Sequence, residues 1–194
     1  RPRSNPVLAA VRMVAALAAT GVSAVLIWND KRTAPNPRER NRRLARRVRQ
    51  WGRWALSISG IRFRFRGRPV PGALLAPNHV SYGDIVVLCA SAGCAFVPKI
   101  ELFDWPIIGP VMRLTGQVAV KRERSRALAG ATEAVADLLR HGSTVAVFLE
   151  GTTTQGDRVL TYRPSFVQAA LDAGAPIQPV AIVWETRRRG LSVA

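Results

Sequence analysis

Cysteine and histidine are the scarcest reactive residues in this chain of 194, which contains two of each. Cys89 and Cys94 are separated by four residues, a spacing that fits neither a zinc site nor a redox pair. The sequence therefore argues against a disulfide scaffold and a structural metal site, and we expect two ordinary thiols in a reducing compartment. Chemistry that needs an imidazole must use His79 or His141, and we expect no role for His141, which stands at a predicted helix end.

Acidic residues are also few, because 12 Asp and Glu stand against 29 Lys and Arg and leave a net charge of +17. Such a charge favours polyanionic partners: nucleic acid, an anionic membrane surface, or phosphorylated or acidic ligands. The excess is local, since residues 31–68 contain fourteen basic residues and a single acid, Glu39. The sequence thus predicts a basic collar attached to an ordinary globular body.

Charged residues make up only 21% of the chain and hydrophobic residues 48%, which excludes a disordered protein. The length predicts one compact domain plus an additional element. The chain begins with Arg1 rather than Met and ends at Ala194 in mid-element, so we expect residues to be missing at both ends.

The longest apolar run, residues 13–28, contains no charge and no proline. A membrane-spanning helix needs about 20 apolar residues, so the run is borderline, and we favour a retained anchor or a half-inserted helix. A signal peptide and a buried soluble helix are the alternatives, although no small-x-small cleavage site follows. The Lys and Arg excess on the C-terminal side of the run predicts an inner-membrane protein whose body lies in the cytoplasm.

Residues 37–59 predict a second helix, with apolar residues at helical spacing and arginines on the other face. An arginine-rich amphipathic helix that contains Trp51 and Trp54 suits the headgroup layer of an anionic bilayer. Pro35 and Pro37 separate it from the first helix, so we expect a helical hairpin. The alternatives are a solvated helix packed on its own domain and a nucleic-acid-binding helix. The adjacent apolar run and the absence of a zinc-finger, RNP-type or basic-zipper pattern disfavour nucleic acid.

Short apolar runs alternate with helical patterns in the rest of the chain. The predicted strands are 61–66, 73–76, 95–97, 118–120, 145–149 and 177–183. The predicted helices are 85–92, 105–114, 125–140 and 164–173. This order predicts an α/β fold with a mostly parallel mixed sheet covered by helices. We expect two parts, a membrane-associated helical hairpin at 1–60 and an α/β domain at 61–194.

A polar stretch, residues 78–84, joins a predicted strand to the next predicted helix. Ser81 and Asp84 have the spacing of a capping box, which makes Ser81 the expected N-cap. Five residues across a tight corner can bring the carboxylate of Asp84 to the imidazole of His79. A carboxylate on one ring nitrogen fixes the tautomer and leaves the other nitrogen free as a base. A capping and packing role for the pair is the alternative.

Two further stretches place charges at the ends of predicted strands. Lys121 and Arg122 follow one strand and can bind an anion; the alternative is a solvated loop. Glu150 ends a second, apolar strand and precedes Gly151 and Thr152. An acid in that place suggests a binding role, and the alternative is a turn whose acid caps a neighbouring helix.

In order and spacing, these stretches resemble the motifs of the glycerolipid acyltransferase family, typified by 1-acylglycerol-3-phosphate acyltransferase. The first motif, N-H-x-S-x-x-D, is complete, and three others match in part over residues 62–183. The matching residues are Asn78, His79, Ser81 and Asp84, then Gly116, Val120 and Arg122, then Phe148, Glu150, Gly151 and Thr152, and finally Pro179.

The sequence departs from the family pattern at three positions. Ala119 stands where an aromatic residue is usual, Leu149 where a proline is usual, and Thr153 where an arginine is usual. The missing arginine removes one expected phosphate ligand, so either other arginines compensate or the acceptor head group differs, as in lyso-ornithine lipid. The candidates for compensation are Arg122, Arg158 and Arg163.

The resemblance implies transfer of a fatty acyl chain from a thioester, either acyl-coenzyme A or acyl-carrier protein, to the sn-2 hydroxyl of lysophosphatidic acid. The product is phosphatidic acid for phospholipid synthesis. His79 is then the general base and Asp84 its orienting partner, without an acyl-enzyme, and no metal or cofactor beyond the donor is implied. The implied substrate-binding residues are Arg122, Lys121, Glu150, Gly151, Thr152, Asn78 and Ser81.

The N-terminal hairpin likewise resembles the membrane-docking element of bacterial family members. The expected partners are an anionic phospholipid membrane, a lysophospholipid and the acyl donor, and no nucleic acid. Two other classes stay open: a catalytically silent membrane-binding module, and a nucleic-acid binder that uses the basic collar. The second should bind DNA with a steep salt dependence.

Overall fold

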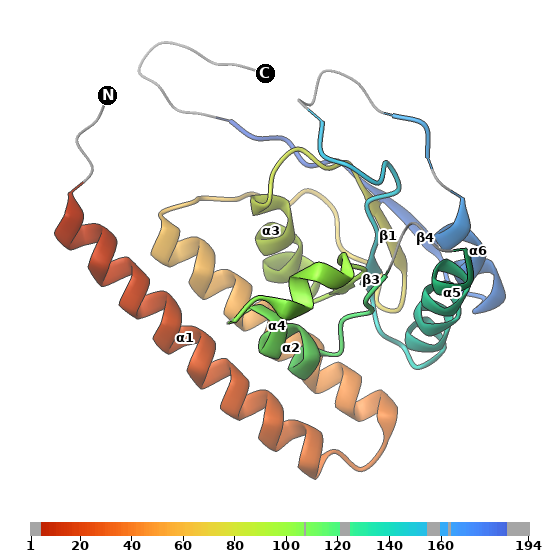
Figure 1. Cartoon of the computed structure of the whole chain (residues 1–194), viewed down its shortest axis with the longest axis horizontal. Helices are drawn as coiled ribbons and strands as arrows, with labels where there is room; N and C mark the ends of the chain where they lie inside the picture. Colours follow the sequence, from red (N-terminus) through yellow and green to blue (C-terminus); the bar gives the residue numbers. More distant parts are fainter. Residues whose placement is uncertain (1–4, 107, 121–124, 155–159, 163, 186–194) are drawn as a thin grey trace.

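The computed structural model describes residues 5–106, 108–120, 125–154, 160–162 and 164–185. In this part of the chain a helical hairpin precedes an α/β body (Figure 1). The elements are α1 (Pro6–Thr33), α2 (Pro37–Ser59), β1 (Leu74–Pro77), α3 (Gly83–Ala92), β2 (Ala95–Phe96), the 3₁₀ helix η1 (Ile100–Asp104), α4 (Ile108–Thr115), α5 (Ser125–Arg140), β3 (Val145–Ala146), α6 (Ser165–Asp172) and β4 (Ile177–Val180).

Local sequence signals set the ends of the two hairpin helices. Asn5 and Asn36 are the N-caps of α1 and α2, and their side-chain oxygens accept hydrogen bonds from backbone N–H groups of the first turn. Pro6 and Pro37 follow the caps, where the missing N–H of proline costs nothing. Gly60 ends α2 with a φ of 74°, a left-handed conformation that favours glycine. The predicted hairpin is confirmed, and α1 extends beyond the apolar run at both ends.

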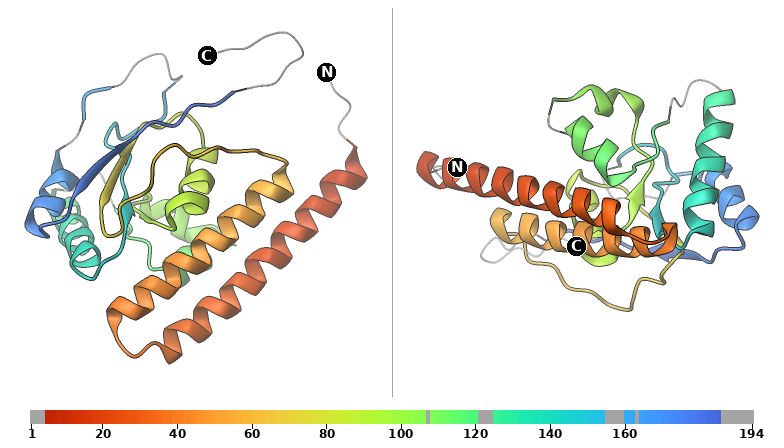
Figure 2. Two further views of the ribbon diagram at one scale, coloured as in Figure 1. Left: turned by 180° about the vertical axis from the view of Figure 1, so that it is seen from behind. Right: turned by 90° about the horizontal axis from the view of Figure 1, so that it is seen from below.

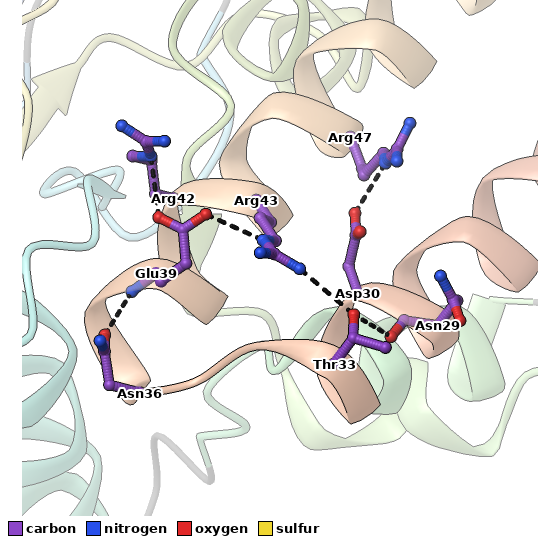
Figure 3. A network of polar contacts seen from close by, with 8 residues as sticks. All are labelled: Asn29, Asp30, Thr33, Asn36, Glu39, Arg42, Arg43 and Arg47. Atoms are coloured by element: carbon purple, nitrogen blue, oxygen red, sulfur yellow. Dashed lines mark hydrogen bonds and ion pairs between the residues drawn. The ribbon is translucent and has the colours of Figure 1, made fainter.

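Polar contacts join the two helices near their connection (Figure 3). Arg47 Nε lies 2.7 Å from Asp30 Oδ2, and the hydrogen bond from this guanidinium holds the pKa of Asp30 below its usual value. Arg43 donates from Nε to Glu39 on its own helix and from Nη1 to Thr33 Oγ1 on α1. These two arginines therefore serve the hairpin itself and are not free to meet a partner.

α1 packs with one side against α2, where Trp51 Nε1 donates to Thr20 Oγ1 at 3.1 Å. With 28 residues it is about 42 Å long, and by length and composition it could cross a membrane. Its other sides expose a row of large apolar side chains: Val7, Leu8, Val11, Met13, Val14, Leu17, Val22, Val25 and Trp28. This surface has no cover within the described part of the chain.

The strands form a parallel four-stranded sheet in the order β2-β3-β1-β4. Alternate residues of the strands face opposite sides. Leu74 of β1 and Val145 of β3 pack in a hydrophobic cluster with α5 and α6, whereas Leu75 and Ala146 pack in a second cluster with α2 and α3. Helices therefore cover both faces of the sheet, and Figure 2 shows the hairpin and the α5–α6 pair on opposite sides of the body. The predicted α/β fold is confirmed.

α2 and α3 approach closely because glycines stand at their crossing. A Cβ at Gly52 would lie 2.9 Å from Ala90 Cα, and a Cβ at Gly93 would collide with the backbone of α2. Arg49 of α2 also donates to the carbonyl of Ala92 at the C-terminal end of α3. The domain boundary that we expect at residue 60 thus lies at the end of α2, a helix that packs closely against α3 of the α/β body.

The strand predicted at 61–66 is wrong, because these residues form no strand. The alternation of arginine with Phe63 and Phe65 is real, but the two exposed rings pack edge to face on each other, with centroids 5.8 Å apart, rather than on a sheet. Farther on, the side chain of Gln178 on β4 binds the carbonyl of Arg68 and the N–H of Val70. The backbone groups of Arg68 and Val70 are thus bound by the side chain of Gln178 and not by the backbone of a neighbouring strand.

Other predicted elements are shorter than expected. The strand predicted at 118–120 is reduced to one bridge between Lys99 and Val120. Val118 and Val120 donate to the carbonyls of Phe96 and Pro98, but Pro98 has no N–H with which to return a bond to Val118. β3 ends at Ala146, and the helix predicted at 105–114 begins only at Ile108. Trp105 precedes a proline and is extended, which keeps the helix from starting there.

Both cysteines lie on the α2–α3 side of the sheet and are free and buried. Burial raises the pKa of Cys89 to about 12 and that of Cys94 well above its usual value. At neutral pH both are therefore unreactive thiols that pack as small apolar side chains.

Candidate active site

The predicted pair of His79 and Asp84 meets at the C-terminal end of β1, where a short loop leads into α3. Nδ1 of His79 lies 2.9 Å from Oδ2 of Asp84. Beside a carboxylate Nδ1 carries the ring proton, which leaves the lone pair on Nε2. Among the described residues Nε2 has no hydrogen-bond partner, and the side chain of His79 is 13% exposed. The ring is thus oriented, basic and within reach of solvent.

Asp84 is fully buried, at 0% exposure, in the first turn of α3. Burial raises the pKa of its carboxyl, but the hydrogen bonds outweigh burial and hold the pKa below its usual value. Besides His79, the donors to Oδ2 are the N–H groups of Val80 and Ser81, at 2.7 and 2.9 Å. Oδ1 accepts from the indole Nε1 of Trp184 at 2.7 Å. The carboxylate is therefore charged, and four donors hold it in place.

Ser81 and Asp84 make the two bonds of the predicted capping box. Ser81 Oγ accepts the N–H of Gly83, and the N–H of Ser81 donates to Asp84 Oδ2. Tyr82, which directly precedes the first residue of α3, already has helical backbone angles and makes no side-chain capping bond. The capping role predicted for Ser81 is therefore confirmed.

Asn78 precedes the histidine and uses both ends of its side-chain amide on one residue. Its Nδ2 donates to the carbonyl of Ile182 at 3.0 Å, and its Oδ1 accepts the N–H of Ile182 at 2.7 Å. The amide thereby fastens the segment after β4 to the loop that carries His79. This contact favours a structural part for Asn78 over the predicted contact with substrate.

The third stretch lies next to the histidine. The ring of Phe148 stacks on His79, with centroids 3.8 Å apart and an interplanar angle of 16°. Two residues later Glu150 is 4% exposed, and its Oε2 accepts the N–H of Leu160 at 3.1 Å. Its Oε1 is buried and has no hydrogen-bond partner among the described residues. Glu150 binds a loop rather than capping a helix, so the capping alternative fails.

The comparisons with known proteins decide the family. The sequence profile of a family described as Acyltransferase matches residues 62–183, which is more than half of the chain. The chain belongs to the acyltransferase family.

Curated relatives in this family carry two kinds of name. A lyso-ornithine lipid O-acyltransferase of Rhizobium meliloti is 38% identical over 140 residues, which cover 70% of this chain and 47% of the relative. A 1-acyl-sn-glycerol-3-phosphate acyltransferase of Neisseria gonorrhoeae is 34% identical over 159 residues, which cover 79% of this chain and 60% of the relative. The chain thus matches less than two thirds of the length of either.

One solved structure has the same fold. The 1-acyl-sn-glycerophosphate acyltransferase of Thermotoga maritima superposes with a TM-score of 0.61, covering 86% of this chain and 73% of its own, at 20% sequence identity. At that identity the likeness concerns the fold, which matches the α/β body and its parallel sheet.

Not every predicted site residue lies in the described part of the chain. Lys121 and Arg122 lie outside the described residues, as do Arg158 and Arg163. Gly151 has a φ of 71°, and Thr152 after it is exposed. His141 directly follows α5 and is partly exposed, and its Nδ1 lies 2.8 Å from the carbonyl of Asp137.

The structure adds two residues to the site that the sequence analysis did not select, Phe148 and Trp184, and it places a further cation, Lys99, beside Val120. Phe148 belongs to the third motif, but its stacking on His79 becomes visible only in the fold. Trp184 follows the last strand, and its indole nitrogen was the only signal that it could bind a carboxylate. Lys99 is exposed and pairs with Val120, so it lies beside the strand end from which Lys121 continues.

No group of three or more His, Cys, Asp or Glu that could hold a metal ion occurs among the described residues. The groups that contact one another at His79 are the imidazole, the buried carboxylate of Asp84 and the neutral donors to that carboxylate. These groups can move a proton to and from a substrate hydroxyl.

Proposed function

We propose that this chain transfers a fatty acyl group from an acyl thioester to the free hydroxyl of a lysolipid. The observation that carries the proposal is the contact of His79 with a buried, charged Asp84 at the end of β1. A base of this kind contributes about 10²–10⁴-fold to a proton-transfer step. The membership of the chain in the acyltransferase family supports the reaction class.

In the proposed mechanism Nε2 of His79 accepts the proton of the acceptor hydroxyl while the oxygen attacks the thioester carbonyl carbon. The carbon–sulfur bond then breaks, and the thiolate takes the proton back from the imidazolium. The products are the acylated lipid and a free thiol on coenzyme A or on the carrier protein. Asp84 keeps the ring in one tautomer and stabilises its charged form. No cofactor other than the donor takes part.

For the acceptor we propose lysophosphatidic acid, acylated at its sn-2 hydroxyl to phosphatidic acid. Arg122, with Lys121, binds the phosphate, since a guanidinium can hold it through two parallel bonds. Lys99 adds a cation on the neighbouring segment. Glu150 and the backbone of Gly151 and Thr152 hold the glycerol part. Oε1 of Glu150, which has no hydrogen-bond partner among the described residues, is the proposed acceptor.

Lyso-ornithine lipid is the second candidate acceptor. Thr153 stands where the family pattern has a phosphate-binding arginine, and a relative at 38% identity is named for this substrate. An acceptor without a phosphate would not need the missing guanidinium.

We further propose that the hairpin at 1–60 docks the α/β domain at 61–194 on the cytoplasmic side of the inner membrane. The exposed apolar row of α1 and the exposed arginines of α2 support a partner that is apolar inside and anionic at its surface. A nucleic acid would leave the apolar row uncovered. Docking also brings His79 to a substrate that resides in the bilayer.

The test is a panel of lysolipids incubated with the purified chain and either acyl-coenzyme A or acyl-carrier protein, with products identified by mass spectrometry. We expect one lysolipid to be acylated and free thiol to appear in equal amount. His79→Ala is the control, and it should remove turnover while leaving the fold and liposome binding intact. A His79→Ala variant that kept more than about a tenth of the wild-type rate would refute the general-base role.

A further inference from the structure

Trp184 lies four residues after the end of β4, far in sequence from the residues that it contacts. Its indole N–H donates to Oδ1 of Asp84 at 2.7 Å. The other carboxylate oxygen, Oδ2, faces three donors: His79 Nδ1 and the N–H groups of Val80 and Ser81. Among the described residues Trp184 is thus the one donor to Oδ1. Without it, half of a fully buried carboxylate would have no partner.

The sequence around the site is adapted to this indole. A Cβ at Gly83 would lie 2.6 Å from the Cη2 and Cζ2 atoms of Trp184, so the six-membered ring occupies the space that a side chain would need. The φ of Gly83 is not in the left-handed region, and an alanine would suit the first turn of a helix. The close approach of Trp184 therefore explains the glycine, whereas backbone conformation does not.

The segment that carries Trp184 is itself fixed to the same loop. Asn78 binds both the N–H and the carbonyl of Ile182, two residues before the tryptophan. This clamp determines where the indole lies relative to Asp84. A chain of contacts thus runs from Asn78 through Ile182 and Trp184 to Asp84 and the imidazole of His79.

We propose that Trp184 is a positioning residue for the His79–Asp84 pair and that Asn78 holds it in place. The inference rests on the proposed general-base role of His79. Trp184 touches neither substrate nor the reacting imidazole; it fixes the plane of the carboxylate, so that Oδ2 stays directed at His79 Nδ1. A carboxylate that lost its donor on Oδ1 would rotate to share the donors of Oδ2, and the imidazole would lose its alignment.

Trp184→Phe tests this directly, because phenylalanine keeps an aromatic ring and removes the N–H donor. Hydrogen bonds to charged groups are stronger than those between neutral groups, so we expect kcat to fall about tenfold or more, with KM for both substrates unchanged. Trp51→Phe is the matched control, since it removes an indole hydrogen bond to Thr20 inside the hairpin. Measured on detergent-dispersed substrate, it should leave kcat unchanged. Wild-type kcat in Trp184→Phe would overturn the proposal.

Gly83→Ala provides a second test that does not depend on removing the tryptophan. The new methyl group should displace the indole and lower kcat in the wild-type background. In the Trp184→Phe background the colliding ring atoms are absent, so the same alanine should cost little more. Coupling of this kind is expected for residues in contact. Equal losses in both backgrounds would show that Gly83 acts independently of Trp184 and would contradict the proposal.

A spectroscopic measurement separates this inference from the proposed function. The indole ¹H–¹⁵N signal of Trp184, assigned by its loss in Trp184→Phe, should move when Asp84→Asn removes the charge and should stay in place in His79→Ala. If His79→Ala retained full activity but the signal responded to Asp84→Asn, the contact would stand and the general-base role would fail. An indole signal that ignored Asp84→Asn would refute the positioning role itself.

Discussion

Asp84 carries its charge at a place that water does not reach. It can do so because four donors replace its hydration, two from the backbone and two from the rings of His79 and Trp184. A buried carboxylate without such donors would be protonated, since burial alone favours the neutral form. In the proposed mechanism this charge stabilises the imidazolium that forms when His79 takes a proton.

Asp84→Asn should therefore lower both activity and stability. An amide cannot hold the ring proton on Nδ1 in the same way, so we expect turnover to fall about a hundredfold or more. The pKa of Asp84 is held below its ordinary value of 3.8, so its carboxylate stabilises the folded state above that pH and ceases to do so as pH falls through the folded-state pKa. Thermal unfolding of both proteins from pH 7 to pH 3 checks this.

The gap in Tm between the wild-type chain and Asp84→Asn should be widest near neutral pH and should narrow in acid. A gap that widened in acid would mean that the carboxyl is stabilised in its neutral form, against the donor geometry.

The central pair of the site could be predicted from sequence because its members are five residues apart on one strand-to-helix corner. Its supports could not be predicted. Phe148 and Trp184 reach the site only because β1 lies between β3 and β4 in the sheet. No local pattern encodes that order of strands. The capping role of Ser81 could be predicted as well, because its bonds to Gly83 and Asp84 are local.

At the scale of single elements, α2 performs two tasks on different sides. One side packs against α3 and the sheet, through Val48 and the crossing at Gly52, and another holds α1 through Arg47. Arg42, Arg46 and Arg53 remain exposed. The helix thus links the apolar row of α1 rigidly to the body that carries the site.

Gly52→Ala should loosen this link. The new Cβ would lie within 3 Å of the backbone of α3, and forcing helices apart costs about 1–3 kcal/mol, so we expect a clear drop in Tm. Gly21→Ala is the control, because Gly21 also lies inside a helix but has nothing within 4 Å of its Cβ position. That change should be neutral or should stabilise by up to about 1 kcal/mol. Equal unfolding temperatures for the two variants would contradict the close crossing.

Helices could be located from sequence more reliably than strands. The bounds expected for α2 and α5 agree with Pro37–Ser59 and Ser125–Arg140, because each has caps or breakers and a long periodic pattern. β2 and β3 have two residues each, which is too few to show the alternation of apolar and polar residues that predicts a strand. The alternation of arginine and phenylalanine after Gly60 has the pattern of a strand. A strand also needs a neighbouring strand to pair with, and local sequence does not show whether one is present.

At the scale of the whole molecule, the membrane docking that we propose depends on the hairpin. Arg43 and Arg47 are engaged in the hairpin, and Arg53 donates to the carbonyl of Ala90 on α3. By contrast, the exposed residues Arg38, Arg40 and Arg46 of α2 make no hydrogen bond or ion pair among the described residues. Electrostatic attraction to an anionic surface is therefore expected from the second group. Removing members of the first group would disturb the fold and would confuse the result.

The triple variant Arg38→Gln, Arg40→Gln, Arg46→Gln should bind phosphatidylglycerol-containing vesicles about a hundredfold more weakly, since each basic residue near such a surface contributes about 1 kcal/mol. Flotation measures the binding. Turnover should fall on vesicle-borne lysolipid and not on detergent-dispersed lysolipid. Arg140→Gln on α5 reports the effect of lower net charge alone. Unchanged flotation of the triple variant would place the anionic contact elsewhere.

The strand order also has a consequence for biosynthesis. β1 pairs with β3 and β4, through Leu74 with Val145 and with Ile177, so its partners follow it by about 70 and about 100 residues, and pairing over such separations is slow. A nascent chain therefore exposes α1 and α2 well before the sheet can close. A ribosome-bound chain could then be captured by lipid while its catalytic half is still unfolded, and the bilayer would become the surface on which that half completes its folding.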